Sequence, residues 1–254
     1  MTDALRLAFG TLTALRVNAP TRVDASVART AMLLAPVAAL PFASVVLLAH
    51  LAVSALQIGP LLAAGLLLAV LALGTRALHW DGLADTTDGL AAGYDRERAL
   101  TVMRRSDIGP AGVCAVVLVL LVQAAALAAL LPSSQGAALA AVGVLASRHT
   151  LAWLCRPEIG PARPDGLGAA VAGTVPSWAA ASAGLLLGSL AALAGLPVGL
   201  SWYAGPLVVV VAVAAALVLG WRADQRFGGI TGDVLGAGVE VGLAAALALG
   251  TTLV

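Results

Sequence analysis

Seven stretches of the chain are long and apolar enough to cross a lipid bilayer, and they constrain the fold more than any other feature. A helical span needs about 20 mainly apolar residues. Hydrophobic residues make up 61% of the chain and charged residues 11%, against about 25% charged residues in an ordinary soluble domain. We therefore expect an all-α fold, a polytopic membrane helix bundle that forms one integral-membrane domain over residues 1–254. The predicted spans are 31–56, 61–78, 111–131, 137–155, 177–196, 206–221 and 234–253, the last of which contains Glu240.

The charged residues are concentrated in alternate connections between these spans. The connections 57–60, 132–136 and 197–205 contain none, whereas the other connections and the N-terminal segment hold nearly every Asp, Glu and Arg. Arginine-rich connections lie on the cytosolic side of membrane proteins. We therefore expect a multi-pass protein of the cell (inner) membrane, with its active site facing the cytoplasm.

The N-terminal segment, residues 1–30, is predicted to lie in the cytosol or at the membrane interface. Leu5, Phe9, Leu12 and Leu15 recur at helical spacing, which suits a helix on the membrane surface, and a mobile polar tail is the alternative. The net charge is +1, and no basic face remains once the arginines are assigned to loops. Nucleic acid is therefore not an expected partner, whereas the lipid bilayer is.

The segment 79–89, HWDGLADTTDG, gathers three aspartates next to a predicted span. Asp81, Asp85 and Asp88 are spaced i, i+4 and i+7, which on a helix places them within an arc of about 60°. Carboxylates without Cys or paired His favour Mg²⁺ or Mn²⁺ over Zn²⁺, and Mg²⁺ commonly completes its coordination with substrate phosphates and water. The alternative is a solvated acidic face, which is disfavoured because charge is costly at a membrane. The spacing therefore predicts that Asp81, Asp85 and Asp88 bind metal.

The arginines that follow the aspartates favour a phosphate ligand. We expect residues 79–110 to form an Asp-rich catalytic loop and an interfacial helix, with Asp95 as the N-cap of that helix. Arginine forks beside an acid-bound metal would complete a diphosphate clamp. The alternative is that these arginines only orient the protein in the membrane, as in an ordinary cytosolic loop. The arginines are Arg96, Arg98, Arg104 and Arg105.

Three further features on the same side of the membrane are candidates for the site. Arg148 and His149 lie inside the fourth predicted span, where a charge needs a partner or a water-filled cavity. The segment 156–168 supplies Arg163 and Asp165 in a Pro-rich loop. A glycine-rich stretch at 227–233 precedes the last span, and such a helix N-terminus can bind an anion through its backbone N–H groups. That stretch contains Thr231 and Asp233.

Several of these stretches together carry a family resemblance. They read H-W-D-G-L-A-D-T-T-D-G at 79–89, M-R-R-S-D-I-G-P-A-G at 103–112, R-H at 148–149, P-D-G-L-G at 164–168 and G-G-I-T-G-D-V-L-G-A at 228–237. In this combination the chain resembles the cobalamin synthase family, the adenosylcobinamide-GDP ribazoletransferases. The resemblance runs over most of the chain, and the first motif is highly specific.

The resemblance implies a Mg²⁺-dependent transferase with two small-molecule substrates. In the implied reaction, α-ribazole or its 5′-phosphate is joined to adenosylcobinamide-GDP with release of GMP, giving adenosylcobalamin or its 5′-phosphate. This is the last step in assembly of the cobalamin nucleotide loop. Asp81, Asp85 and Asp88 are then catalytic as well as metal-binding, and His79 either accepts a proton or orients an aspartate. The residues expected to bind substrate are Arg104, Arg105, Asp107, Arg148, His149, Arg163, Asp165, Thr231 and Asp233.

Other functions stay open at this level. The run from Asp85 to Ala92 is similar to the first half of the motif of CDP-alcohol phosphotransferases, but Gly93 stands where that motif has Arg. A membrane prenyltransferase would need a second Asp-rich cluster, and a transporter would place its acidic cation site near the bilayer midplane. The acceptor's phosphorylation, its lower base, the number of metal ions and a possible homo-oligomer are not determined by the sequence.

Overall fold

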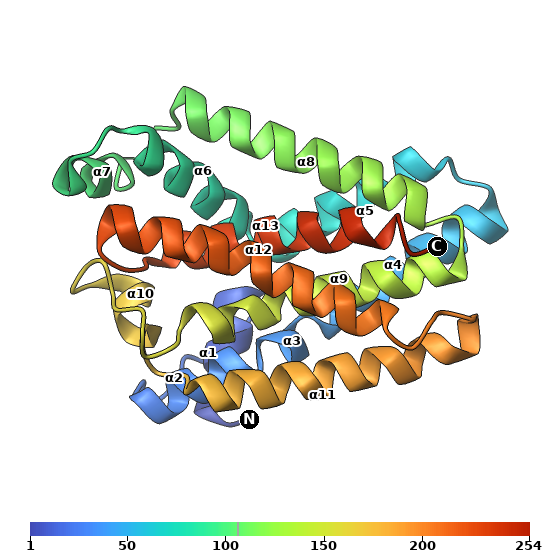
Figure 1. Ribbon diagram of the computed structural model, residues 1–254, viewed down its shortest axis with the longest axis horizontal. Coiled ribbons are helices and arrows are strands. Elements are labelled where there is room, and N and C mark those ends of the chain that lie inside the picture. Colours follow the sequence, from blue (N-terminus) through green and yellow to red (C-terminus); the bar gives the residue numbers. More distant parts are fainter. Residues whose placement is uncertain (106) are drawn as a thin grey trace.

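The computed structural model describes residues 1–105 and 107–254, so Ser106, inside the second motif, lies outside the described residues. Within them the chain is helical and has no named strand, which confirms the predicted all-α membrane bundle (Figure 1). The helices are α1 (Asp3–Leu12), α2 (Ala25–Leu33), α3 (Ala35–Ala38), α4 (Leu40–Leu56), α5 (Pro60–Gly74), α6 (Leu78–Ala91), α7 (Arg96–Val102), α8 (Pro110–Leu130), α9 (Ser134–Leu154), α10 (Gly166–Val171), α11 (Ser177–Gly195), α12 (Ala204–Phe227) and α13 (Gly232–Gly250).

The predicted number of seven spans is not confirmed. Among the described residues, 5 helices are long and apolar enough to cross a membrane, namely α8, α9, α11, α12 and α13. A sixth span results if α5 and α6 are counted as one span bent by 87°. The first predicted span is instead divided among α2, α3 and the shorter apolar helix α4. Pro36 and Pro41 lie in the first turns of α3 and α4, and proline has no backbone N–H with which to continue a preceding helix.

The break between α5 and α6 is made by two successive residues in the left-handed conformation. Arg76 has φ 57° and Ala77 has φ 55°, a conformation that is uncommon for residues with a side chain. The N-terminal segment holds this break in place. The Arg76 guanidinium donates to the carbonyl of Gly10 at 2.7 Å, and the N–H of Ala14 donates to the carbonyl of Gly74 at 2.6 Å. The aspartates that follow lie on helix α6, as their spacing predicted, rather than in the loop expected at this position.

The first 30 residues fold back onto the bundle at its charged-loop end. Helix α1 is confirmed, but it ends at Leu12, and Leu15 beyond it is exposed. Asp3 accepts hydrogen bonds from the hydroxyl and the backbone N–H of Thr21, and these bonds lower the pKa of Asp3. Helix α1 is thus packed into the folded protein, and the alternative of a mobile tail is wrong.

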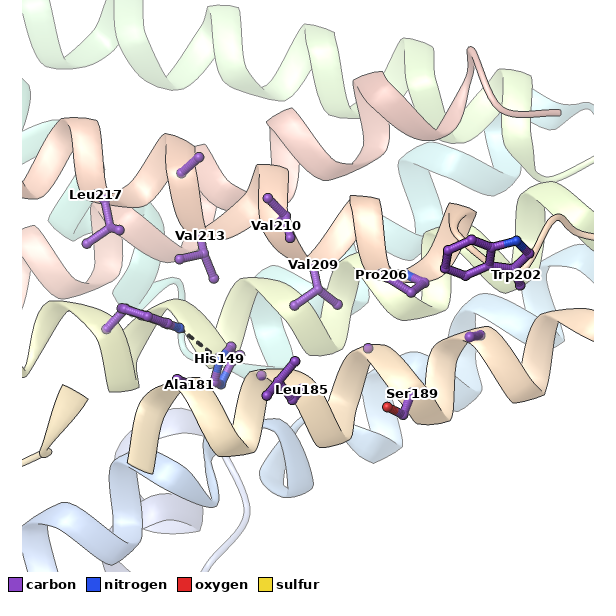
Figure 2. A pocket seen from close by; sticks show the side chains of 15 residues that line it. His149, Ala181, Leu185, Ser189, Trp202, Pro206, Val209, Val210, Val213 and Leu217 are labelled. Atoms are coloured by element: carbon purple, nitrogen blue, oxygen red, sulfur yellow. Dashed lines mark hydrogen bonds between the residues drawn. The ribbon is translucent and has the colours of Figure 1, made fainter. Parts of the chain in front are cut away.

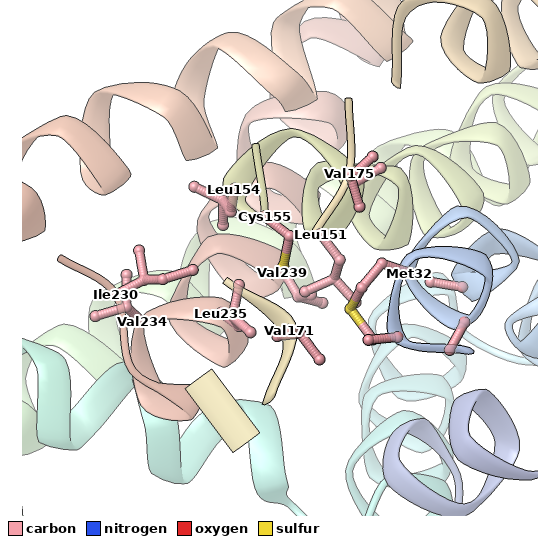
Figure 3. Close-up of a cluster of buried hydrophobic side chains, with 14 of the residues drawn as sticks. Met32, Leu151, Leu154, Cys155, Val171, Val175, Ile230, Val234, Leu235 and Val239 are labelled. Atoms are coloured by element: carbon pink, nitrogen blue, oxygen red, sulfur yellow. The ribbon is translucent and has the colours of Figure 1, made fainter. Parts of the chain in front are cut away.

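A hydrophobic cluster joins the N-terminal helices to the charged-loop ends of the long helices. Figure 3 shows Met32 of α2 beside Leu151 of α9, with Val171 and Val175 from the α10 region and Val234 from the start of α13. Each of these side chains is at most 2% exposed. The loops that carry the polar motifs are therefore anchored on a packed apolar base.

Helix α13 is the centre of the bundle, and it packs against α6, α8, α9 and α12. An arginine of the neighbouring helix α9 and a glutamate of α13 itself are buried in this contact. Arg148 of α9 is 2% exposed and Glu240 of α13 is 4% exposed, and their charges are close enough to interact. The side-chain amide of Gln123 on α8 donates to the Glu240 carboxylate at 2.9 Å, and Arg148 donates to the Ser147 hydroxyl at 2.8 Å. Inside a bilayer such charges require partners, and here three helices supply them.

We predict that Arg148 and Glu240 stabilise the fold only as a pair. Arg148→Leu leaves the Glu240 charge buried without compensation, and breaking a buried pair costs about 3–5 kcal/mol. The single variant should therefore lose folded yield and unfold at a lower temperature in detergent. The double variant Arg148→Leu, Glu240→Gln should recover much of that loss. Arg222→Leu, at an exposed arginine of α12, is the control for loss of charge. Equal destabilisation in the single and double variants would contradict the pairing.

Candidate functional site

The three aspartates of helix α6 lie in three different environments. Helix α6 is confirmed as the element that carries them, and their spacing places them on one side of it. Asp81 is exposed, Asp85 is half-buried and Asp88 is buried. The helix alone therefore does not show that these three carboxylates bind one metal ion together.

The carboxylate of Asp88 closes the N-terminus of helix α8. It accepts the N–H of Gly109 at 2.7 Å and the N–H of Gly112 at 2.8 Å. The N-cap residue of α8 is Gly109, which has no side chain of its own to accept these bonds. A Cβ atom at Gly109 would lie 2.5 Å from an oxygen of Asp88, and Gly112 is equally close to that carboxylate. Glycine is required at both positions because the carboxylate approaches the backbone so closely.

A second polar group forms where the loop after α9 meets the start of α13. The backbone of Ala162 donates to the carbonyl of Ile230 at 2.9 Å, and Ile230 donates to the carbonyl of Gly160 at 2.9 Å. These bonds hold the loop against the glycine-rich segment before α13. As a result the Arg163 guanidinium lies 2.9 Å from the Asp233 carboxylate.

Thr231 completes this polar group at the first turn of α13. Its hydroxyl is the N-cap of the helix, accepting the N–H of Val234 at 3.3 Å, and donates to Asp233 at 3.1 Å. The Nε atom of Arg163 is buried and has no hydrogen-bond partner in the part of the chain that the structure describes. That N–H and the positive end of the α13 dipole are both suited to an anion.

These residues line a polar cavity of about 210 Å³ at the charged-loop end of the bundle. Its walls contain four residues that the sequence predicted to bind substrate, Arg163, Asp165, Thr231 and Asp233. A fifth, Arg104, reaches the rim from the end of α7 and binds Asp165 at 2.9 Å. Residues separated by up to 129 positions in the sequence are thus brought together at one place.

Helix α6 meets this cavity through a close backbone contact. A Cβ atom at Gly82 would lie 2.6 Å from the carbonyl oxygen of Asp233, so only glycine allows the two helices to approach this closely. The charges of Asp81, Asp85 and Asp233 are near enough to repel one another, and Arg163 offsets part of that repulsion. Asp233, which the sequence predicted to bind substrate, lies near the aspartates of α6.

The carboxylates have the chemistry of a Mg²⁺ site, although the chain alone does not assemble one. Within residues 1–105 and 107–254, no group of three or more His, Cys, Asp or Glu side chains is arranged to hold a metal ion. Mg²⁺ is typically bound by one or two carboxylates together with substrate phosphates and water. Asp81 and Asp85 beside a cavity with an arginine fit that pattern, and the three-aspartate ligand set of Asp81, Asp85 and Asp88 stays a prediction.

Other predicted site residues lie elsewhere. His79 is buried against α13, with its Nδ1 atom 3.8 Å from Glu240, and within the described residues it makes no hydrogen bond to an aspartate. Arg148 points into the bundle core, and His149 lines a different, apolar cavity. Arg105 and Asp107 are exposed, and no ion pair joins them in the described chain. Their predicted roles are not supported by contact with the polar cavity.

Arg96 and Gln123 have roles that depend on distant contacts and differ from what the sequence predicted. Arg96, placed in the diphosphate clamp, donates instead to the backbone carbonyls of Phe227 and Ala162 and holds α7 against both loops of the cavity. Gln123 was not singled out, yet it is fully buried and binds Glu240. A lone amide in an apolar span was the signal available for Gln123, whereas no local signal distinguishes Arg96 from its neighbours.

Comparisons with known proteins agree with the resemblance. The family model described as Cobalamin-5-phosphate synthase matches residues 4–251. A relative from a Nocardioides species is 50% identical over 247 residues, covering 97% of each chain. Relatives from Frankia casuarinae and Bradyrhizobium diazoefficiens are 41% and 40% identical over 95% and 94% of this chain and 92% and 89% of their own. All three are named adenosylcobinamide-GDP ribazoletransferase. No solved structure matches the chain.

These matches cover nearly the whole chain at high identity, so they apply to the polar cavity and the helices around it alike. They favour a transferase of cobalamin synthesis over the transporter considered from the sequence. The chain belongs to the cobalamin-5-phosphate synthase family.

Proposed function

We propose that the protein joins α-ribazole, or its 5′-phosphate, to adenosylcobinamide-GDP and releases GMP. The observation that carries this proposal is a polar cavity lined by Arg163, Thr231 and Asp233. Asp81 and Asp85 of α6 lie close enough to Asp233 for their charges to interact with it. An arginine, a helix N-terminus and several carboxylates together suit a diphosphate whose charge is balanced by a metal ion. The names of the relatives specify the substrate whose diphosphate would bind there.

The reaction is a substitution at phosphorus. The ribazole hydroxyl forms a new P–O bond to the cobinamide-side phosphorus, and the P–O bond to GMP breaks, so that GMP leaves with the bridging oxygen. The proton of the hydroxyl passes to a base, for which a carboxylate of Asp81 or Asp85 is near the cavity. The problem for the protein is negative charge on the departing nucleotide, which fixed positive groups stabilise.

Different residues near the cavity have different proposed roles in binding the diphosphate. Arg163 has its buried Nε–H free for a phosphate oxygen, while Asp233 fixes the other side of its guanidinium. The first turn of α13 provides backbone N–H groups toward the same anion. Arg104 forms an ion pair with Asp165, which lines the cavity.

Mg²⁺ is the cofactor proposed for this site, where it would neutralise diphosphate charge while the bond to GMP breaks. Asp81 and Asp85 would hold it, with Asp233 as a neighbouring carboxylate. Asp88 is already engaged by two backbone N–H groups of α8, and its predicted part as a third ligand is tested by the same experiment as the other two.

The test is release of GMP by purified protein, measured against Mg²⁺ concentration for the wild type and three Asn variants. Asp81→Asn and Asp85→Asn remove ligand charge and should raise the Mg²⁺ concentration for half-maximal rate by at least about tenfold, the lower end of what an outer-shell partner is worth. Asp88→Asn should change this concentration little. It should instead lower the unfolding temperature in EDTA, because one backbone N–H of α8 loses its partner.

Glu97→Gln, an exposed charge loss on α7 whose side chain makes no hydrogen bond in the described structure, is the control for both measurements. A Mg²⁺ requirement that rises as much in Asp88→Asn as in Asp85→Asn would make Asp88 a ligand after all. Wild-type GMP release that continues unchanged in excess EDTA would remove the metal from the proposal, and absence of any GMP release would remove the reaction.

We also propose that the polar cavity faces the cytoplasm from the cell (inner) membrane. The charged connections all meet at the end of the bundle where the cavity lies, and the uncharged connections meet at the other end (Figure 1). The side with the arginines is the cytosolic side.

This orientation predicts the labelling pattern of single cysteines in a background without Cys114 and Cys155. An impermeant thiol reagent added to intact cells should label positions 57, 134 and 199, and it should label positions 86, 158 and 231 only after the membrane is opened. Because Thr86 and Thr231 are buried, Glu158 is the informative cytosolic position, being exposed on a loop. Labelling of position 158 from outside would reverse the orientation.

A further inference from the structure

One arginine outside the polar cavity contacts both of the loops that build it. Arg96, the first residue of α7, donates through Nε to the carbonyl of Phe227 at 2.5 Å and through a terminal nitrogen to the carbonyl of Ala162 at 3.0 Å. Phe227 ends α12, and Ala162 belongs to the loop between α9 and α10. Figure 1 shows α7, α10 and the turn between α12 and α13 at the same end of the bundle. A single guanidinium therefore joins two segments that are far apart in the sequence.

The two carbonyls lie shortly before Arg163 and shortly before the start of α13. Ala162 directly precedes Arg163, and its own N–H donates to the carbonyl of Ile230 at 2.9 Å. The backbone of Ala162 is thus held on one side by Ile230 and on the other by Arg96. Phe227 begins the short segment that leads to Ile230. The position of the Arg163 backbone therefore depends on the contact with Arg96.

The guanidinium of Arg96 lies directly against the end of α12. Gly228 is the C-cap of that helix and has the left-handed φ of 70°. A Cβ atom at Gly228 would lie 3.1 Å from Nε of Arg96, so the missing side chain gives the guanidinium room to reach the carbonyl of Phe227. Arginine presents its donors in a rigid plane, whereas lysine presents a compact ammonium on a flexible stem. The arginine thus holds the two carbonyls in one fixed relation that lysine does not reproduce.

Helix α7 does not depend on Arg96 for its own place in the fold. Ala99 of α7 is fully buried in the hydrophobic cluster at this end of the bundle. Arg226 of α12 donates to the carbonyl of Gly93, in the turn before α7, and lies over the ring of Tyr94 at 4.6 Å from its centre. Loss of the Arg96 guanidinium should therefore leave α7 packed and release only the two loops.

We propose that Arg96 is a positioning residue for the transfer reaction, which holds Arg163 where its guanidinium binds the diphosphate. This rests on the proposed function, because the diphosphate is the ligand that it gives to Arg163. Arg96 itself is not among the described residues that line the polar cavity, and both of its contacts are to backbone carbonyls. Asp233 fixes the side chain of Arg163, and Arg96 fixes the backbone that carries it.

The first test is GMP release at saturating substrate and Mg²⁺ by the wild type, Arg96→Lys, Arg163→Lys and the double variant. Arg96→Lys keeps the charge but not the planar fork. It should lower the rate roughly 10- to 100-fold, the loss expected when a group that positions substrate is displaced by about 1 Å. Because Arg96 acts through Arg163, the double variant should match Arg163→Lys within about twofold, the scatter of independent effects.

Hydrogen exchange in detergent measures the loops independently of the reaction. The peptides that contain Ala162 and Ile230 should exchange about two- to tenfold faster in Arg96→Lys, the ratio given by one lost hydrogen bond. Peptides from α8 should exchange as in the wild type, which also shows that the variant is folded. Arg96→Gln takes its place if Arg96→Lys does not fold. Arg222→Lys, at an exposed arginine of α12, is the control and should match the wild type in both measurements.

Three results would overturn the proposal. An equal loss of rate from Arg96→Lys in the wild type and in Arg163→Lys would show that Arg96 acts independently of Arg163. Faster exchange throughout the chain would give Arg96 a role in general stability only, and unchanged exchange of both loops would remove its role in holding them. Absence of GMP release by the wild type would instead remove the proposed function, and hydrogen exchange would still decide whether Arg96 holds the loops.

Discussion

The close approach of helices α6 and α13 is the contact on which the polar site depends. Gly82 faces the backbone of Asp233, and Gly236 faces the backbone of His79. With a Cβ atom at either glycine the helices would separate, and the carboxylates of α6 would move away from Arg163. Two positions without side chains therefore determine which charged groups lie together, although neither glycine takes part in the chemistry.

Charge is distributed in two layers that serve different purposes. At the loop end, the carboxylates and Arg163 surround a cavity and are left partly exposed. Deeper in the bundle, Arg148 and Glu240 are almost completely buried and balance each other. An arginine keeps its charge at any physiological pH, so α9 always requires a counter-charge from α13. The deeper pair thereby fixes helix α13, whose first turn lines the polar cavity.

The sequence predicted the long helices well because a uniform apolar stretch needs no knowledge of tertiary contacts. The expected span at 111–131 is found as Pro110–Leu130, and the one at 177–196 as Ser177–Gly195. The prediction failed at 31–56, where the prolines were overlooked, and at Arg76 and Ala77, where neither glycine nor proline marks the left-handed turn. The expected span therefore ran on to residue 78, whereas α5 ends at Gly74.

The site was predicted less completely, because residue type does not determine direction. Arg148 and His149 are neighbours, yet successive residues of a helix point about 100° apart, so Arg148 faces the bundle core and His149 lines the apolar cavity (Figure 2). Asp88 has the right spacing for a ligand, but its partners come from the start of α8, 21 and 24 residues later. The loops that contain Arg163 and Asp233 were correctly grouped because both carry charge on the same side of the membrane.

The contact between the N-terminal segment and the break after α5 links two parts of the chain that are far apart in the sequence. Gly10 and its partner Arg76 are 66 residues apart. The left-handed turn that orients the acidic helix is thus supported from outside its own stretch of sequence. A substitution in the N-terminal segment that removes this support would therefore act on the orientation of α6, although it touches none of the charged residues of the site.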